Sequence, residues 1–356
     1  MIRIPFLGKP KKYLGIDIGT FSIKIVELSY SKKGDVVLEN YGEKVNQVDR
    51  ENFYKDPRKK TFSLPHQKIA DNLKNILSQA KIGKREAIFS IPDFMTFFTV
   101  FRIPPLPKEE IASAVEFEAR QHIPLPLKEV SLDWSIVGKA EKEKKKGPKI
   151  LLVAVPNKVI SEYQKIAEQA GIKLLSIEAE VFSLARASVF GEPPGKAIQI
   201  VDIGVQSTTI SVVREGTVEL TYSINLSENE ITKALVSEMD ISYNEAERIK
   251  YEVGFDENCE EGAILCSQLN ILADEIKQVS DNFFRTEKKE IRKIALAGGI
   301  ASSPGIIDYL EKKTHKEVRA INPFLNLSYP PILKETIEEI GPRYAIAAGI
   351  ALRDKK

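Results

Sequence analysis

Apolar and polar residues alternate along the stretch Tyr13 to Leu28, YLGIDIGTFSIKIVEL. Apolar side chains occupy every second position up to Ile18, and the alternation resumes at Ile23 after a short polar tip. A period of two is typical of a strand with one buried face. The pattern therefore predicts a hairpin, in which two strands are joined by a tight polar turn.

The chain contains this pattern a second time, in the stretch 197–213, AIQIVDIGVQSTTISVV. Asp202, Gly204 and Ser207 stand there in the same relative order as the Asp, Gly and Ser of DIGTFS in the first copy. One such hairpin would be ordinary turn chemistry. The repetition predicts two related subdomains that face one ligand.

The remaining periodicity predicts a mixture of strands and helices. Short apolar runs predict strands at 36–45, 87–91, 97–101, around Trp134, at 150–155 and at 294–297. Helical spacing predicts helices at 65–80, 109–121, 158–169, 228–250, 269–285 and 341–352, a strand end and helix over 177–189, and a helical pattern from Ile306. We expect the polar stretch 49–63 to be a loop and the charged stretch 139–149 to be a solvated hairpin tip.

Composition narrows the class of protein. The chain has 356 residues, of which 43% are hydrophobic and 29% charged, as is typical of a soluble globular chain with two or three cores. A formal net charge of +2 argues against a nucleic-acid or acidic-membrane role driven by bulk charge. No apolar run approaches the roughly 18 residues that span a bilayer, and the first residues lack the apolar core of a signal peptide. We therefore expect a cytoplasmic protein.

Cysteines and histidines give no sign of a metal or catalytic cluster. Cys259 and Cys266 fit neither a CxxC pair nor a disulfide framework, so we expect reduced thiols. His66, His122 and His315 are scattered, and no Walker A string occurs.

The first hairpin tip offers groups that suit a polyphosphate with its magnesium ion. The carboxylate of Asp17 can hold a metal-bound water, and Gly19 lets backbone N–H groups approach a ligand closely. Thr20 and Ser22 add hydroxyl groups, and Lys24 adds a cation on the returning strand. A third element follows the apolar strand 294–297, where Gly298 and Gly299 would let the backbone pack flat against a base.

Three motifs, in this order, resemble the actin-like ATPase superfamily, which includes actin, sugar kinases, chaperone ATPases and FtsA. They are DIGTFSIK (17–24), DIGVQSTT (202–209) and ALAGGIASSPG (295–305). Over nearly the whole chain the resemblance is closest to the PilM family of type IV pilus assembly proteins. It implies an α/β, actin-like ATPase fold, with two lobes of duplicated core subdomains around a nucleotide cleft and a small α+β insert called 1C.

The resemblance also implies domain boundaries. Subdomain 1A would contain 1–86, 176–196 and 335–356, and the 1C insert would be 87–175. Subdomain 2A would contain 197–226 and 268–334, and subdomain 2B would be 227–267.

The resemblance implies ATP and Mg2+ as cofactors, with the metal held through water by Asp17 and Asp202. The residues expected to contact the nucleotide are Asp17, Gly19, Thr20, Phe21, Ser22, Lys24, Asp202, Gly204, Ser207, Thr208, Glu247, Lys250, Gly298, Gly299 and Ile300. Glu180 best matches the residue near the attacking water, although a solvated or capping carboxylate is equally consistent with its position. Similarly, Glu247 and Lys250 resemble the ribose-binding pair but fit a plain i,i+3 ion pair as well. Whether ATP is hydrolysed, even slowly, stays open.

For function, the resemblance implies an ATP-binding adaptor of the type IV pilus inner-membrane platform. It would bind the cytoplasmic N-terminal peptide of a PilN-like membrane protein, meet other platform or motor proteins, and reach the membrane only through its partner. We expect the peptide groove between the 1C insert and the first lobe, where strand edges could accept an extended segment. The alternatives are an FtsA-like filament or secretion-system component, which would self-associate, and a small-molecule kinase. At residues 353–356 the chain shows no linker and membrane helix of the FtsA type, and this favours the interpretation as a pilus assembly protein.

Overall fold

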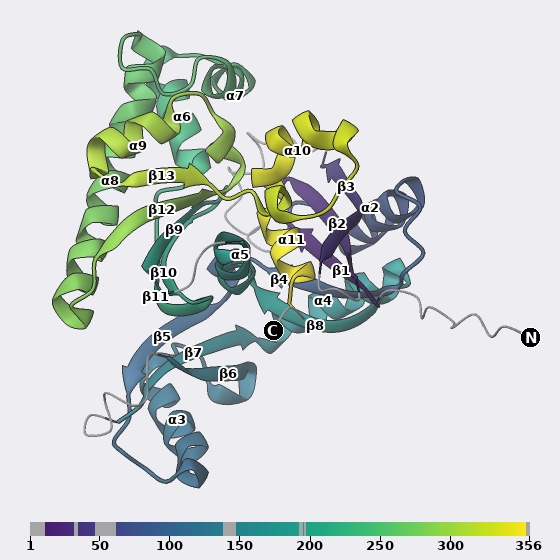
Figure 1. The fold of residues 1–356 in the computed structure, drawn as a ribbon, viewed down its shortest axis with the longest axis vertical. Helices are drawn as coiled ribbons and strands as arrows, with labels where there is room; N and C mark the ends of the chain where they lie inside the picture. Colours follow the sequence, from purple (N-terminus) through teal and green to yellow (C-terminus); the bar gives the residue numbers. More distant parts are fainter. Residues whose placement is uncertain are drawn as a thin grey trace, which may run out of the picture.

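The computed structural model describes residues 11–31, 35–46, 62–137, 147–191, 195 and 197–353. These residues form two lobes, each built on a five-stranded sheet, and a smaller third sheet (Figure 1). Among the described helices, none combines the length and the apolar character that a membrane crossing requires.

The first sheet contains the predicted hairpin and confirms it. Its strands, in spatial order, are β3 (Val36–Val45), β2 (Ser22–Tyr30), β1 (Lys11–Ile18), β4 (Glu86–Ile91) and β8 (Lys173–Ala179). The three strands β1, β2 and β3 are antiparallel, whereas β4 and β8 continue the sheet in parallel with β1. The β1–β2 register places Asp17 opposite Lys24.

The second sheet repeats this topology, as the sequence repeat predicts. Its strands, in the same spatial order, are β11 (Thr217–Ile224), β10 (Thr208–Arg214), β9 (Ala197–Ile203), β12 (Ile291–Ala297) and β13 (Glu317–Ala320). Again a three-stranded antiparallel meander is extended by two parallel strands. The lobes are therefore structural duplicates in their core.

Helices cover both faces of each sheet. The outer face of the first sheet packs against α2 (His66–Gln79) and α4 (Asn157–Ala170), and its inner face against α11 (Ala345–Ala351). The inner face of the second sheet packs against α5 (Glu180–Val189), which lies beside α11 between the sheets (Figure 1). Its outer face packs against α8 (Glu260–Glu287) and α9 (Ile306–Thr314). Helices α6 (Glu228–Met239) and α7 (Tyr243–Glu252) join the same hydrophobic core, with α6 beside α8 and α7 beside α6. A short helix, α10 (Lys334–Ile340), precedes the 3-10 turn Gly341–Tyr344 that leads into α11.

The region 228–250, expected as one helix, is two helices. The backbone at Asp240 has φ 52°, in the left-handed region, and this ends α6. The side chain of Ser242 then accepts a hydrogen bond of 3.2 Å from Glu245 N and begins α7. Ser242 and Glu245 thus form the start of a helix with a side-chain cap, which explains why the chain becomes helical again there.

The third sheet forms the core of the insert. It contains β5 (Phe97–Arg102), β7 (Lys149–Pro156) and β6 (Val130–Val137), with α3 (Lys108–His122) packed against it. This unit lies inside the range 87–175 suggested for the insert and is narrower, because β4 and β8 pair within the first sheet. Helix α4 also belongs to the first lobe, where Tyr163 is fully buried. Most of the predicted loop 49–63 and of the charged tip 139–149 lies outside the described residues.

Candidate functional site

A cavity of about 780 Å³ lies between the lobes, where the two hairpin tips face each other. The tips have the same turn, since Gly19 N donates to Ser22 O at 3.0 Å and Gly204 N donates to Ser207 O at 3.0 Å. Gln206 Nε2 of the second tip donates to Thr20 Oγ1 of the first across 3.2 Å. The duplicated turns therefore meet at one ligand-sized space.

Most residues singled out from the sequence line this cavity. They are Asp17, Gly19, Thr20, Phe21, Ser22, Lys24, Glu180, Asp202, Gly204, Ser207, Glu247, Gly298 and Gly299. Thr208, Lys250 and Ile300 do not line it, because each is fully buried in the second lobe. Their expected contact with a ligand would require the lobe to rearrange. The cavity wall also contains residues that sequence reasoning missed, notably Glu43, Asp93, Gln206, Glu228, Tyr251 and Arg343.

Among the missed residues, Asp93 lies near Asp202, one of the two expected metal-binding carboxylates. It follows β4, whose parallel neighbour β1 ends beside Asp17. Asp93 Oδ1 accepts a hydrogen bond of 3.2 Å from Val181 N, and Asp93 N donates to Glu180 Oε2 at 3.3 Å. The residue thus caps α5 from another element and orients Glu180. Its position after a parallel strand, where α/β sheets place their ligand sites, was a signal that the sequence did offer.

Four carboxyl groups crowd the floor of the cavity: Asp17, Asp93, Glu180 and Asp202. Burial is the main cause that raises the pKa of each, to about 7 for Asp93 and for Asp202. Neighbouring acids raise the pKa of Asp93, Glu180 and Asp202 further. Lys24 partly offsets the rise for Asp17 and Asp202, and Ser90 Oγ donates to Asp17 Oδ1 at 2.8 Å. The cluster is therefore short of positive charge.

This donor set fits a hydrated divalent cation. Carboxylates and waters are the ligands that Mg2+ prefers, and it usually keeps several waters. Asp93 Oδ2 is buried and has no hydrogen-bond partner among the described residues, so an acceptor is available. Within the described part of the chain, no three His, Cys, Asp or Glu side chains are arranged as a direct metal site. The arrangement suits a metal held through water.

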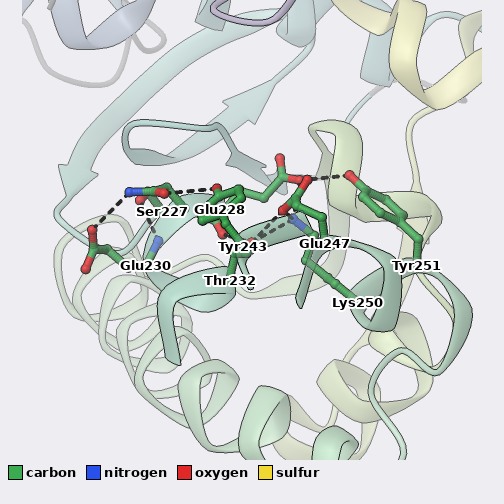
Figure 2. Close-up of polar contacts among 9 residues, drawn as sticks. Ser227, Glu228, Glu230, Thr232, Tyr243, Glu247, Lys250 and Tyr251 are labelled. Carbon is green, nitrogen blue, oxygen red and sulfur yellow. Dashed lines mark hydrogen bonds and ion pairs between the residues drawn. The ribbon is translucent and has the colours of Figure 1, made fainter. Parts of the chain in front are cut away.

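A buried polar network forms the second-lobe wall of the cavity (Figure 2). Lys250 Nζ donates to Glu228 Oε1 at 2.8 Å, to Thr232 Oγ1 at 3.0 Å, and to Glu247. Tyr251 OH donates to Glu228 Oε1 at 2.8 Å. An ammonium group has three protons, and protein oxygens accept all of them. Of the pair expected at the ribose, Glu247 faces the cavity, whereas Lys250 lies behind it.

Glycines keep the part of this wall next to the network flat. Gly298 has φ +95°, and a Cβ there would lie 2.2 Å from Ile203 O, so no larger residue fits. A Cβ on Gly299 would approach Tyr251 OH to 3.4 Å and Glu228 Oε2 to 3.7 Å. The glycines thus leave open the space beside the Glu228 network, as a planar ligand group would need.

A second cavity, of about 650 Å³, lies between the insert and the first lobe. Its apolar wall includes Leu132 and Trp134 of β6 and Leu174 and Leu175 of β8. Among the described strands, β6 pairs only with β7 and β8 only with β4, so each is an edge strand. At one end, Arg353 Nε lies 3.7 Å from Glu178 Oε2. We call this cavity the edge-strand groove.

Comparison with known proteins agrees with this fold. A family profile described as type IV pilus assembly protein PilM matches residues 15–355. The structure of a PilM-PilN type IV pilus biogenesis complex is similar, with a TM-score of 0.80 and 22% identity, over 96% of this chain and 98% of that chain. The ethanolamine utilization protein EutJ from Carboxydothermus hydrogenoformans is more distant, with a TM-score of 0.56 and 17% identity, over 96% of this chain and 90% of that chain. At these identities the two structures show the fold alone.

The cell division protein FtsA of Bacillus subtilis (strain 168) is a sequence relative. It is 24% identical over 197 residues, which cover 48% of this chain and 44% of FtsA. The match therefore spans less than half the length of that protein. The duplicated sheets, the helices between them and the intervening cavity are those of the actin-like ATPase fold.

Proposed function

Since the chain belongs to the family of the type IV pilus assembly protein PilM, we propose that it is a cytoplasmic ATP-binding adaptor of the pilus inner-membrane platform. It captures the cytoplasmic N-terminal segment of a PilN-like membrane protein and reaches the membrane through that partner. The edge-strand groove is the observation that carries this proposal, because its two edge strands lie beside apolar side chains. The similar fold of PilM in a complex with PilN supports the choice of partner.

The groove has the features of a site for an extended peptide. Main-chain groups at a strand edge can pair with an added strand, and pockets for alternate side chains supply specificity. Leu175 on β8 is about half exposed at 50%, and Trp134 on β6 lines the facing wall. A segment with apolar residues at alternate positions would bury these side chains while pairing with β6 or β8.

Direct titration tests the groove. A fluorescent peptide from the N-terminus of the cognate PilN-like protein should bind the full chain, and Leu175→Glu should weaken that binding by about tenfold or more, because a charge would be buried against the peptide. Ile332→Glu is the matched control, since Ile332 is 90% exposed and does not line the groove. Deleting 87–175 is a poor test, because the deletion would remove β4 and α4 from the first lobe. Equal binding by Leu175→Glu and wild type would refute the groove assignment.

The cavity between the lobes would hold ATP with Mg2+. Asp17 and Asp202 would bind the metal through water, and the turns at 19–22 and 204–207 would meet the phosphates. Gly298, Gly299 and Glu247 would face the adenosine. The metal would supply the positive charge that the buried carboxylates need, and it would bring them back to the ionised form. If ATP is hydrolysed, Glu180 would orient the attacking water; the hydrogen bond from Asp93 N to Glu180 Oε2 supports this role.

Ligand-induced stabilisation tests the nucleotide site. Mg-ATP at one hundred times its dissociation constant should stabilise the fold by about 2.7 kcal/mol. Asp17→Asn should remove most of this effect and keep the fold, since Asn can still accept the hydrogen bond from Ser90. An unchanged melting temperature of the wild type in saturating Mg-ATP would contradict nucleotide binding and leave the peptide proposal standing.

A further inference from the structure

Charges of alternating sign form a row from the floor of the inter-lobe cavity to its rim. Asp17, Lys24 and Glu43 are cross-strand neighbours on β1, β2 and β3. Arg343, from the 3-10 turn before α11, extends the row. Lys24 Nζ lies 3.8 Å from Glu43 Oε1, and Arg343 Nη2 lies 3.4 Å from Glu43 Oε2. Glu43 thus uses its two oxygens to hold two cations.

The row becomes more exposed toward the rim. The exposed fraction is 3% for Asp17, 14% for the Lys24 side chain, 16% for the Glu43 side chain and 42% for the Arg343 side chain. All four residues line the cavity. Lys24 Nζ also donates to Ser22 Oγ at 2.6 Å, which ties the row to the first hairpin tip. An anion bound at the first hairpin tip would therefore lie beside Lys24, with Glu43 next to that cation.

The backbone that carries Arg343 is held rigidly against the first sheet. Helix α11 packs on β1 so closely that a Cβ on Gly15 would lie 2.1 Å from Ala347 O. The turn Gly341–Tyr344 leads directly into this helix, and Tyr344 is buried. The core thus fixes where the Arg343 backbone lies relative to Lys24, while the guanidinium can turn at the rim.

Carboxylates and phosphates compete for the same donors. Lys and Arg form charge-assisted hydrogen bonds with either, and Arg can bind either through two parallel N–H donors. In this structure Glu43 forms ion pairs with both Lys24 and Arg343, the two cations that a phosphate group in the cavity would also attract. Glu43 would therefore oppose an anionic ligand both by occupying the cations and by repelling the ligand's charge.

We propose that Glu43 is a built-in competitor for polyphosphate, and that Arg343 is a second phosphate-binding cation beside Lys24, released from Glu43 when the ligand enters. The inference rests on the proposed binding of a nucleoside triphosphate in this cavity and deepens it. Its effect is to weaken binding and favour release.

Calorimetric titration of the full chain with Mg-ATP tests the proposal. Glu43→Gln should tighten binding by about tenfold, and Arg343→Gln should weaken it by about tenfold, as expected when one charge-assisted hydrogen bond to the ligand is strengthened or removed. Mg-tripolyphosphate should show the same two changes, because both concern the phosphates. A change with Mg-ATP alone would assign the two residues to the nucleoside and overturn the proposal.

Three control variants separate competition from a general charge effect. Glu39→Gln removes the same charge from the same strand, at a residue that pairs with Lys12 at 3.0 Å, and should leave affinity unchanged. Glu252 also lines the cavity, where it pairs with Arg248, so Glu252→Gln removes a carboxylate from the cavity wall without touching Lys24 or Arg343. Its increase in affinity should be no more than about a third of the increase that Glu43→Gln gives.

Arg292→Gln, at an exposed residue paired with Glu290, is the control for Arg343→Gln.

The outcomes distinguish this inference from the function on which it rests. If the wild type binds Mg-ATP and Glu43→Gln binds equally or more weakly, Glu43 is not a competitor and the inference is overturned alone. If Glu252→Gln tightens the binding of Mg-ATP as much as Glu43→Gln does, the cause is the overall negative potential of the cavity, and the inference is overturned also. If the folded wild type binds neither ligand, both the nucleotide part of the proposed function and this inference fail.

Discussion

Lys250 Nζ lies 2.8 Å from Glu228 Oε1, in a fully buried position behind the cavity wall. Lys250→Met would leave Glu228 and Glu247 facing each other without their cation. Removing one partner of a buried ion pair costs about 3–5 kcal/mol, because the remaining charge stays desolvated. We expect a loss of that order in the free energy of unfolding, measured by urea titration. Lys233→Met, at an exposed i,i+3 pair with Glu230, is the control and should change it by less than about 0.5 kcal/mol.

The carboxylate cluster predicts how stability depends on pH without metal or nucleotide. The pKa of Asp202 is raised to about 7 by burial and by Asp17, so between its unfolded value and about 7 the folded state binds more protons than the unfolded state. The contribution of the Asp202 carboxyl group to the free energy of unfolding is fully present below the pKa of the unfolded state, and it is lost as the pH rises through about 7. Asp202→Asn should therefore gain stability over wild type, by about 4 kcal/mol at pH 8, where the full rise of about three pKa units counts, and by less at pH 5. Unfolding in EDTA at several pH values measures this difference, and a difference that is the same at every pH would contradict the assignment.

Close packing of α11 on β1 predicts a cost for the smallest change at Gly15. Gly15→Ala would place a Cβ 2.1 Å from Ala347 O and 2.9 Å from Ala351 N, so the helix must shift away from the sheet. Overpacking of this kind costs about 1–3 kcal/mol or more. Thermal unfolding measures the loss. Gly83→Ala is the control for Gly15→Ala, because no atom lies within 4 Å of a Cβ added at Gly83. This control variant should melt within a few degrees of wild type.

Much of the fold could be predicted from local sequence. The period of two and the small polar turn residues act over a few positions, which is why both hairpins and their repetition are confirmed. The insert boundaries depend instead on which sheet each strand joins. Strand β8 pairs with β4 far away in the chain, and no local pattern specifies that pairing.

For the candidate site too, local sequence predicts the spacing of residues, whereas contacts distant in the chain decide which side chains reach the cavity. Glu247 and Lys250 have the expected spacing on α7, but the packing of α6 against α7 turns Lys250 into the protein and leaves Glu247 at the cavity. Asp93 could have been noticed at the end of a parallel strand. Arg343 could not, because its place at the rim depends on the contact between α11 and Gly15.

Amide hydrogen exchange of the full chain, with and without a peptide from the N-terminus of the cognate PilN-like protein, tests the adaptor proposal most directly. If the peptide adds as a strand, amides of β6 (Val130–Val137) or β8 (Lys173–Ala179) that point away from the paired neighbour should become slower to exchange. Amides of β13 (Glu317–Ala320), the equivalent edge of the second lobe, should be unaffected. Binding of the peptide with protection confined to other elements, or no binding to the folded chain, would contradict the account.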